Sequence, residues 1–175
     1  MIKTLCALVF AMTCVLFVGK SLADEPNCGK TELFQGLMFE LSVQNSLDSD
    51  LLFRFCVGEH ESYLLSELEQ TAVISERAII PGVKYQSKVR LTADVKSKID
   101  DLYKNALARL RPDHIQGLDG STWCFRPKSG SSYAELCYWS PSSAGSSDRA
   151  LQDIANLGEY LLGLSGLQAH GAMLQ

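Results

Sequence analysis

The sequence predicts an α+β domain, in which an antiparallel β-sheet is covered on one face by two amphipathic helices. Apolar and polar residues alternate over several segments of the first half, which is typical of strands. Apolar residues recur at helical spacing in two later segments, and residues 119–141 have the pattern of a β-hairpin. Strands and helices that follow one another in blocks indicate helices on one face of an antiparallel sheet.

The chain begins with a segment that has the features of a secretory signal peptide. Lys3 precedes an apolar run of 15 residues, Leu5–Gly19, and a small-x-small cleavage site ends at Ala23. We expect a signal peptide of residues 1–23, a single domain of residues 24–175 and no membrane attachment after cleavage. The alternative is an uncleaved anchor, but the run is shorter than the ~20 residues that a spanning helix needs.

The expected mature chain is acidic. The leader removes two of the 16 basic residues, Lys3 and Lys20, which leaves 14 Lys and Arg against 20 Asp and Glu. Binding to nucleic acid needs clustered positive charge that neutralises the phosphate backbone, and no such cluster is evident. We therefore expect no nucleic-acid partner.

Four cysteines remain once the leader is removed, and an even number in an exported chain predicts disulfides. Four cysteines allow three connectivities, of which the hairpin register described below selects one. The expected bridges are Cys124–Cys137 and Cys28–Cys56.

A meander of strands is expected before the first helix. Turn residues between Asn45 and Asp50 indicate that the first two strands form a hairpin, and Pro81-Gly82 marks a later turn. The third segment also fits a helical turn because of its leucine spacing. The expected strands are Leu33–Val43, Leu51–Val57, Tyr63–Glu69, Ala72–Ile80 and Tyr85–Leu91.

The first helix is expected over Ala93–Arg111. Thr92 can cap its first turn, and Pro112 cannot continue it. The apolar face predicted to pack on the sheet comprises Val95, Ile99, Leu102, Tyr103, Ala106, Leu107 and Leu110.

The second helix is expected over Ser147–Leu164, after a Ser-rich linker that begins at Ser140. Gly158 and Gly163 should weaken it, because glycine is a poor helix former. Residues 168–175 are expected to be a frayed tail. The predicted apolar stripe comprises Leu151, Ile154, Leu157, Leu161 and Leu164.

Between the two helices, the expected hairpin turns at Gly130-Ser131, where glycine suits the positive φ of a type II′ turn. This register places Cys124 opposite Cys137 as a non-hydrogen-bonded pair, with Cα atoms roughly 4.5 Å apart, which suits a disulfide. It also places Arg126 opposite Glu135, as a cross-strand ion pair. The predicted core face comprises Trp123, Phe125, Pro127, Ala134, Leu136 and Tyr138, and the opposite face comprises Thr122, Arg126, Lys128, Glu135, Trp139 and the two sulfurs.

The residue types needed for hydrolysis are present around His114, with Asp119 and Ser121 in the following loop. Ser121 does not lie in a G-x-S-x-G elbow, and Asp119-Gly120 is more simply a turn before the hairpin. Only three histidines occur, and no zinc-binding or nucleotide-binding motif is present. We therefore expect no catalytic residues, no metal and no cofactor.

Trp139 is the strongest candidate for a binding contact. It projects on the polar face of the hairpin, and Tyr133 and Arg126 complete a composition that is typical of protein contact surfaces. The alternative is that Trp139 covers the disulfide or packs under the Ser-rich loop.

The motif D-G-x-x-W, followed by W-S-P and a Leu-rich helix, resembles a functionally uncharacterised group of small bacterial proteins. The resemblance covers roughly the last half of the chain and implies a bacterial envelope setting, but it carries no activity. The group has a Glu in the first hairpin strand where this chain has Arg126. The motif residues are Asp119, Gly120, Trp123, Trp139, Ser140 and Pro141.

The expectation for function is an exported, non-catalytic module that binds another protein, in the manner of an inhibitor or an immunity factor, in the periplasm or outside the cell. The alternatives are a small hydrolase that uses His114 with Asp119 or Ser121, and a structural envelope protein without a discrete ligand.

Overall fold

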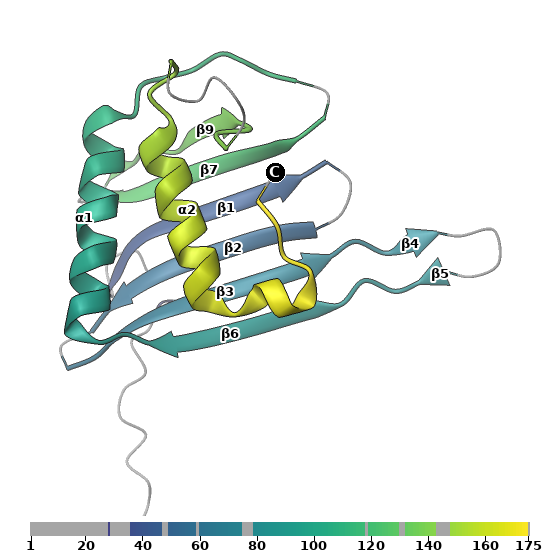
Figure 1. Ribbon diagram of the computed structural model, residues 1–175, viewed down its shortest axis with the longest axis horizontal. Helices are drawn as coiled ribbons and strands as arrows, with labels where there is room; N and C mark the ends of the chain where they lie inside the picture. Colours follow the sequence, from purple (N-terminus) through teal and green to yellow (C-terminus); the bar gives the residue numbers. More distant parts are fainter. Residues whose placement is uncertain are drawn as a thin grey trace, which may run out of the picture.

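A computed structural model describes residues 28, 36–46, 49–58, 60–74, 79–117, 119–129, 132–142 and 148–174 (Figure 1). The expected leader therefore lies outside the described residues. The elements are β1 Leu37–Asn45, β2 Ser49–Val57, β3 Ser62–Gln70, β4 Val73–Ile74, β5 Ile79–Ile80, β6 Lys84–Arg90, α1 Ala93–Arg109, β7 Ser121–Ser129, β8 Ser132–Tyr133, β9 Leu136–Trp139, α2 Gln152–Ser165 and the 3₁₀ helix η1 Leu167–His170.

The predicted α+β class is confirmed. The main sheet is antiparallel with the order β6-β3-β2-β1-β7, and β8 and β9 both pair with the free side of β7. Helix α1 connects β6, at one edge, to β7, on the far side of β1 (Figure 1). Helices α1 and α2 pack side by side on the same face of the sheet (Figure 1).

The strands of the meander follow the predicted alternation. In β1, Leu37, Phe39, Leu41 and Val43 are buried. The third segment is a strand, β3, because its even-numbered leucines enter the core while Glu67 lies on the opposite face. The single strand expected over Ala72–Ile80 is wrong, since only β4 and β5 form there, as a separate two-stranded ribbon. Leu33–Gln35, the expected start of the first strand, lies outside the described residues.

The predicted hairpin register is confirmed. Cys124 lies opposite Cys137 with 4.0 Å between their Cα atoms, and Phe125 lies opposite Leu136. The expected turn residues, Gly130 and Ser131, lie outside the described residues. Ala134 is exposed rather than part of the core, because no strand continues through it.

The helices begin and end at positions that differ from the predicted ones. Thr92 caps α1 as expected, its Oγ1 accepting a hydrogen bond from the Val95 N–H, but the helix ends at Arg109 rather than Arg111. Helix α2 begins five residues later than predicted, at Gln152, because Ala150 has a φ of 58°, which no right-handed helix can include.

The core is centred on aromatic rings between the sheet and α1. The Phe39 ring stacks on Tyr103 at 5.1 Å and also contacts Phe55 and Phe125. The stripe of α2 is buried as predicted, apart from the half-buried Leu164. In α1 the prediction is wrong for Leu107, which is 43% exposed.

Gly158 allows α2 to approach the sheet closely, a role beyond the expected weakening of the helix. A Cβ atom at this position would lie 2.4 Å from Cζ3 of the buried Trp123. Real Cβ atoms do not come that close to a ring carbon, so glycine is required for the contact between α2 and β7.

We expect Gly158→Ala to lower the free energy of unfolding by about 1–2 kcal/mol, because overpacking against Trp123 outweighs the better helix propensity of alanine. Gly163→Ala is the matched control, since its Cβ would meet nothing within 4 Å. That control should stabilise the protein by up to about 1 kcal/mol. Urea unfolding of both variants measures the difference, and a stabilised Gly158→Ala protein would disprove the close contact.

The C-terminal segment is packed against the sheet, so the expected frayed tail is wrong as far as Leu174. Leu167 and Ala172 are buried in the core. The His170 ring stacks on Tyr85 of β6 at 4.2 Å, and its carbonyl oxygen accepts a hydrogen bond from the Gln70 side chain. This segment therefore covers the β3–β6 side of the helical face.

Candidate functional site

The face of the sheet opposite the helices carries a row of alternating charges, which we call the charge ladder. All its members except Glu135 come from adjacent strands, and Glu40 and Glu67 each contact a basic group on either side, with N–O distances across the ladder from 2.5 to 3.1 Å. The predicted Arg126–Glu135 pair, at 2.7 Å, forms one end. From one sheet edge to the other, the ladder comprises Lys84, Glu67, Arg54, Glu40, Arg126 and Glu135.

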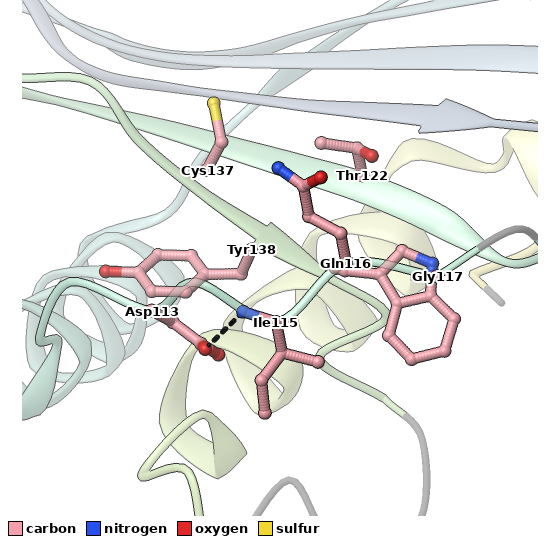
Figure 2. Close-up of a pocket in the computed structure, with 8 residues that line it drawn as sticks. Asp113, Ile115, Gln116, Gly117, Thr122, Cys137 and Tyr138 are labelled. Atoms are coloured by element: carbon pink, nitrogen blue, oxygen red, sulfur yellow. Dashed lines mark hydrogen bonds between the residues drawn. The ribbon is translucent and has the colours of Figure 1, made fainter.

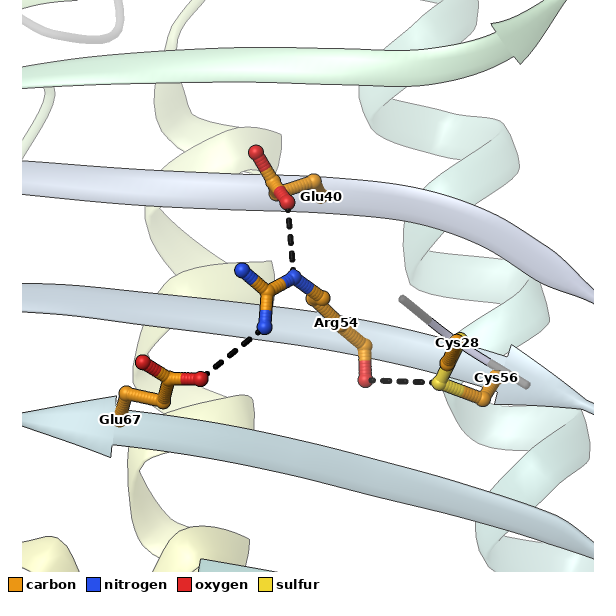
Figure 3. Close-up of a disulfide and its surroundings, with 5 residues drawn as sticks. All are labelled: Cys28, Glu40, Arg54, Cys56 and Glu67. Carbon is orange, nitrogen blue, oxygen red and sulfur yellow. Dashed lines mark hydrogen bonds and ion pairs between the residues drawn. A yellow bond between two sulfur atoms is a disulfide. The ribbon is translucent and has the colours of Figure 1, made fainter. Parts of the chain in front are cut away.

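Arg54 is the centre of the ladder and is only 5% exposed. It donates from Nε to Glu40 and from Nη1 to Glu67 (Figure 3). Burial alone would raise the pKa of Glu67, but Lys84 and Arg54 outweigh it and hold that pKa below its ordinary value. The ladder therefore neutralises charges that the strand register has brought together.

The predicted Cys28–Cys56 disulfide lies at the same face. Cys56 is fully buried and Cys28 is 5% exposed, and Leu37 completes the small cluster around them. Figure 3 shows the bridge beside Arg54, with the Cys56 sulfur 3.8 Å from the Arg54 carbonyl oxygen. This bridge ties Cys28, which lies before β1 in the chain, to β2, a central strand of the sheet.

The second predicted disulfide, Cys124–Cys137, is accessible to solvent, since Cys137 is exposed and Cys124 is half-buried. Glu135 places a carboxylate oxygen within 4.8 Å of both sulfurs. Because the sulfurs are bonded to each other, they are not available as thiolate ligands for a metal. Together, the two bridges indicate that the protein folds in an oxidising compartment.

Beside β9 lies a cavity of about 250 Å³, which we call the β9 slot. It lies between the strand and the segment 113–117 that follows α1, and the residues around it are drawn in Figure 2. Ile115, at its rim, is 49% exposed. The lining residues are Asp113, Ile115, Gln116, Gly117, Thr122, Cys137, Tyr138 and Trp139.

Asp113 holds the outer wall of the slot in place. Its Oδ1 accepts a hydrogen bond from the Ile115 N–H at 2.9 Å, and its Oδ2 pairs with the Arg149 guanidinium at 2.6 Å. The hydrogen bond from Ile115 lowers the pKa of Asp113, and the charge of Arg149 lowers it further. The segment after α1 is thus fastened to the residues just before α2.

Trp139 forms the inner wall of the slot and is half-buried. A Cβ atom at Gly117 would lie 2.1 Å from the Trp139 ring, so the loop before β7 passes directly over the indole. Trp139 therefore packs under this loop, and part of its ring faces the cavity; most of the Ser-rich loop, residues 143–147, lies outside the described residues.

Trp139 and Arg126, two of the three residues predicted as a contact patch, do not lie together. Trp139 pairs with Thr122 and Arg126 pairs with Glu135, so they lie roughly 14 Å apart along β7, four residues at ~3.4 Å each. The Tyr133 side chain lies outside the part of the chain that the structure describes. Only Trp139 contributes to the slot.

The motif residues meet at the open end of the β7–β9 pair. Gly120 has a φ of 129°, and a Cβ there would lie 2.2 Å from Ser140 Oγ. Ser140 Oγ accepts a hydrogen bond from the Ser121 N–H, and Ser121 Oγ accepts one from the Trp123 indole at 2.7 Å. The motif therefore joins the two strands, and only glycine fits at position 120.

The residues of the hydrolase alternative are not arranged for catalysis. Ser121 is 1% exposed and its hydroxyl is engaged by Trp123, whereas His114 is exposed on the segment after α1. Asp119 is exposed at the start of the hairpin. A buried serine that serves as an acceptor cannot attack a substrate in solution.

Tyr138 is one of the residues around the slot, but its side chain is packed in the core, where it carries an unpaired polar group. The residue is 1% exposed, and its hydroxyl has no hydrogen-bond partner among the described residues. Burial raises the pKa of Tyr138 to about 12, with a further contribution from the charge of Asp113. The hydroxyl is therefore protonated at neutral pH and can donate a hydrogen bond.

Comparison with known proteins finds no matching family model, no matching curated protein and no matching solved structure. In the part of the chain that the structure describes, none of the helices has the length and apolar character to span a bilayer.

Acid should loosen the outer wall of the slot. The pKa of Asp113 in the folded protein is lower than its ordinary value of 3.8, so folding favours the ionised carboxylate. The ion pair with Arg149 is therefore fully formed above pH 3.8 and is lost as the pH falls through the lowered pKa. The indole N–H NMR signal of Trp139 should shift in that acid range, with Trp123 as an internal reference.

The matched variant for this titration is Asp113→Asn. It should show the shifted Trp139 signal already at neutral pH and lose most of the acid dependence. A wild-type signal that does not move below pH 3.8 would show that the ion pair does not position the loop over Trp139.

Proposed function

We propose that this chain is an exported, non-catalytic module that binds another protein, as an inhibitor or immunity-type factor does, in the periplasm or outside the cell. The two disulfides support export, because such bridges persist in oxidising compartments. The resemblance of its hairpin motif to small bacterial proteins supports an envelope setting.

The observation that carries this proposal is the rim of the β9 slot. There an exposed aliphatic side chain, Ile115, lies next to a half-buried tryptophan on a rigid support. Aromatic anchors beside a pocket are typical of the residues that dominate protein interfaces. The support is rigid because the hairpin is bridged by Cys124–Cys137 and the loop is fastened by Asp113 and Arg149.

Co-purification with a tagged mature chain tests the proposal, with Ile115→Asp as the interface variant. A charge at the centre of an apolar contact should weaken the complex by about tenfold or more. Leu107→Asp is the matched control, since Leu107 is 43% exposed on α1, away from the slot. A partner that both variants retain equally would show that the slot is not the contact surface.

A further inference from the structure

Within this proposed function, the β9 slot also indicates how the partner would be held. The strand pairs with β7 on one side only, so its other side is an edge of the sheet. Edge strands present main-chain N–H and C=O groups that can pair with another chain. The relevant question is which residues of β9 point these groups outward.

The register of the β7–β9 pair determines which main-chain groups of β9 point outward. Directly opposed residues in an antiparallel pair alternate between wide, hydrogen-bonded pairs and narrow, non-bonded ones. The Cα separation of 4.0 Å makes Cys124–Cys137 a narrow pair, and the hydrogen bond from the Ser140 N–H to the Ser121 oxygen fits the same alternation. Cys137 and Trp139 therefore direct their N–H and C=O groups away from β7, into the slot.

The opposite wall does not use these groups. Within the described residues, no backbone hydrogen bond links Cys137 or Trp139 to the segment 113–117. The intervening cavity of about 250 Å³ is smaller than the ~300–1,000 Å³ of pockets for drug-sized ligands. A short piece of extended main chain suits such a gap better than a large cofactor.

The remaining chemistry of the slot favours an uncharged segment. Asp113 is the only charged residue among those lining it, and its charge is balanced by Arg149. Ile115 and Trp139 offer apolar surface to a side chain of the same segment.

We propose that the partner contributes an uncharged extended segment that pairs with the free edge of β9 and fills the slot. This mode adds a strand to the sheet, in which main-chain hydrogen bonds supply affinity and the pockets beside them supply selectivity. It rests on the proposed function, because it specifies the partner of that same surface.

Amide hydrogen exchange on the free protein gives the first test. The amides of Cys137 and Trp139 should exchange much faster than those of Leu136 and Tyr138, which point toward β7. Slow exchange at Cys137 and Trp139 in the free protein would overturn the proposal, since the edge would already be occupied.

The second test uses a nine-residue peptide selected from a displayed random library on the mature protein. Its binding should protect the Cys137 and Trp139 amides. N-methylation of every second residue of the peptide can fall either on the residues whose N–H groups face β9 or on the residues between them. Only the first pattern should abolish binding. Binding that leaves both amides unprotected, or a selection that enriches no peptide, would overturn strand pairing.

If Ile115→Asp releases a co-purified partner but that partner protects neither edge amide, the proposed function stands and strand pairing fails.

Discussion

Arg54→Met should lower the free energy of unfolding by about 3 kcal/mol, the largest effect expected of any single substitution in the charge ladder. Arg54 is 95% buried and lies between two carboxylates, those of Glu40 and Glu67, whose side chains are only 13% and 18% exposed. Methionine fills a similar volume but leaves both carboxylates without their shared partner. Two mostly buried carboxylates, each keeping a single basic neighbour, Arg126 or Lys84, then face each other across one strand.

Arg90→Met is the matched control. Arg90 also pairs with a glutamate, Glu61 just before β3, at 2.5 Å, but its side chain is 69% exposed. An exposed pair of this kind should change stability by no more than about 0.5 kcal/mol. Urea unfolding at neutral pH measures the free energy of unfolding of both variants. Equally small losses of stability in the two variants would show that burial does not strengthen the ladder.

Neutralising the carboxylates should rescue much of the loss. Combining Arg54→Met with Glu40→Gln and Glu67→Gln removes the two carboxylate charges that Arg54 had paired, so the triple variant should be more stable than the single one. A triple variant that is less stable than Arg54→Met would mean that arginine acts through packing alone.

The two disulfides should open in a fixed order when the folded protein is treated with a dithiol. Reduction requires a thiolate to reach a sulfur atom, form a mixed disulfide and be displaced by its own second thiol, which leaves two protein thiols. Cys137 is exposed, whereas Cys56 is fully buried and Cys28 is 5% exposed. Cys124–Cys137 should therefore open first, and Cys28–Cys56 only when the protein unfolds.

Alkylation followed by peptide mass mapping reads this order directly. At intermediate times the label should be confined to Cys124 and Cys137, and labelling of Cys28 first would contradict the assigned burial. On the loop-entropy estimate, loss of the bridge that spans 13 residues lowers stability by about 3 kcal/mol, and loss of the one that spans 28 residues by about 3.5 kcal/mol. Paired Cys→Ser variants measure the two losses separately.

Local patterns predicted the sheet because one of its faces is buried. Alternation identified which residues of β1 and β2 enter the core, and the register set by the expected turn at Gly130-Ser131 placed Cys124 opposite Cys137. The same patterns do not report contacts between distant elements. Gly158 reads as a weak helix residue until Trp123 is placed beneath it, and the C-terminal segment reads as a tail until His170 is seen on Tyr85.

The site was predicted in part. Trp139 was identified from its place on the hairpin, but Ile115, Asp113 and Arg149 were not, because the slot depends on how the loop after α1 folds back over β9. The ladder centred on Arg54 was missed as well, although one signal was present. Charged residues recur on the polar face of successive strands, and only the strand order shows that their signs alternate.

The most direct test of the central claim, that the rim of the β9 slot contacts a protein partner, is site-specific photo-crosslinking in the cells that produce the protein. A photoreactive residue at position 115 should give one discrete adduct, and the same residue at position 107, similarly exposed on α1, should not. Adducts of equal yield at both positions, or an adduct at 107 alone, would contradict the claim.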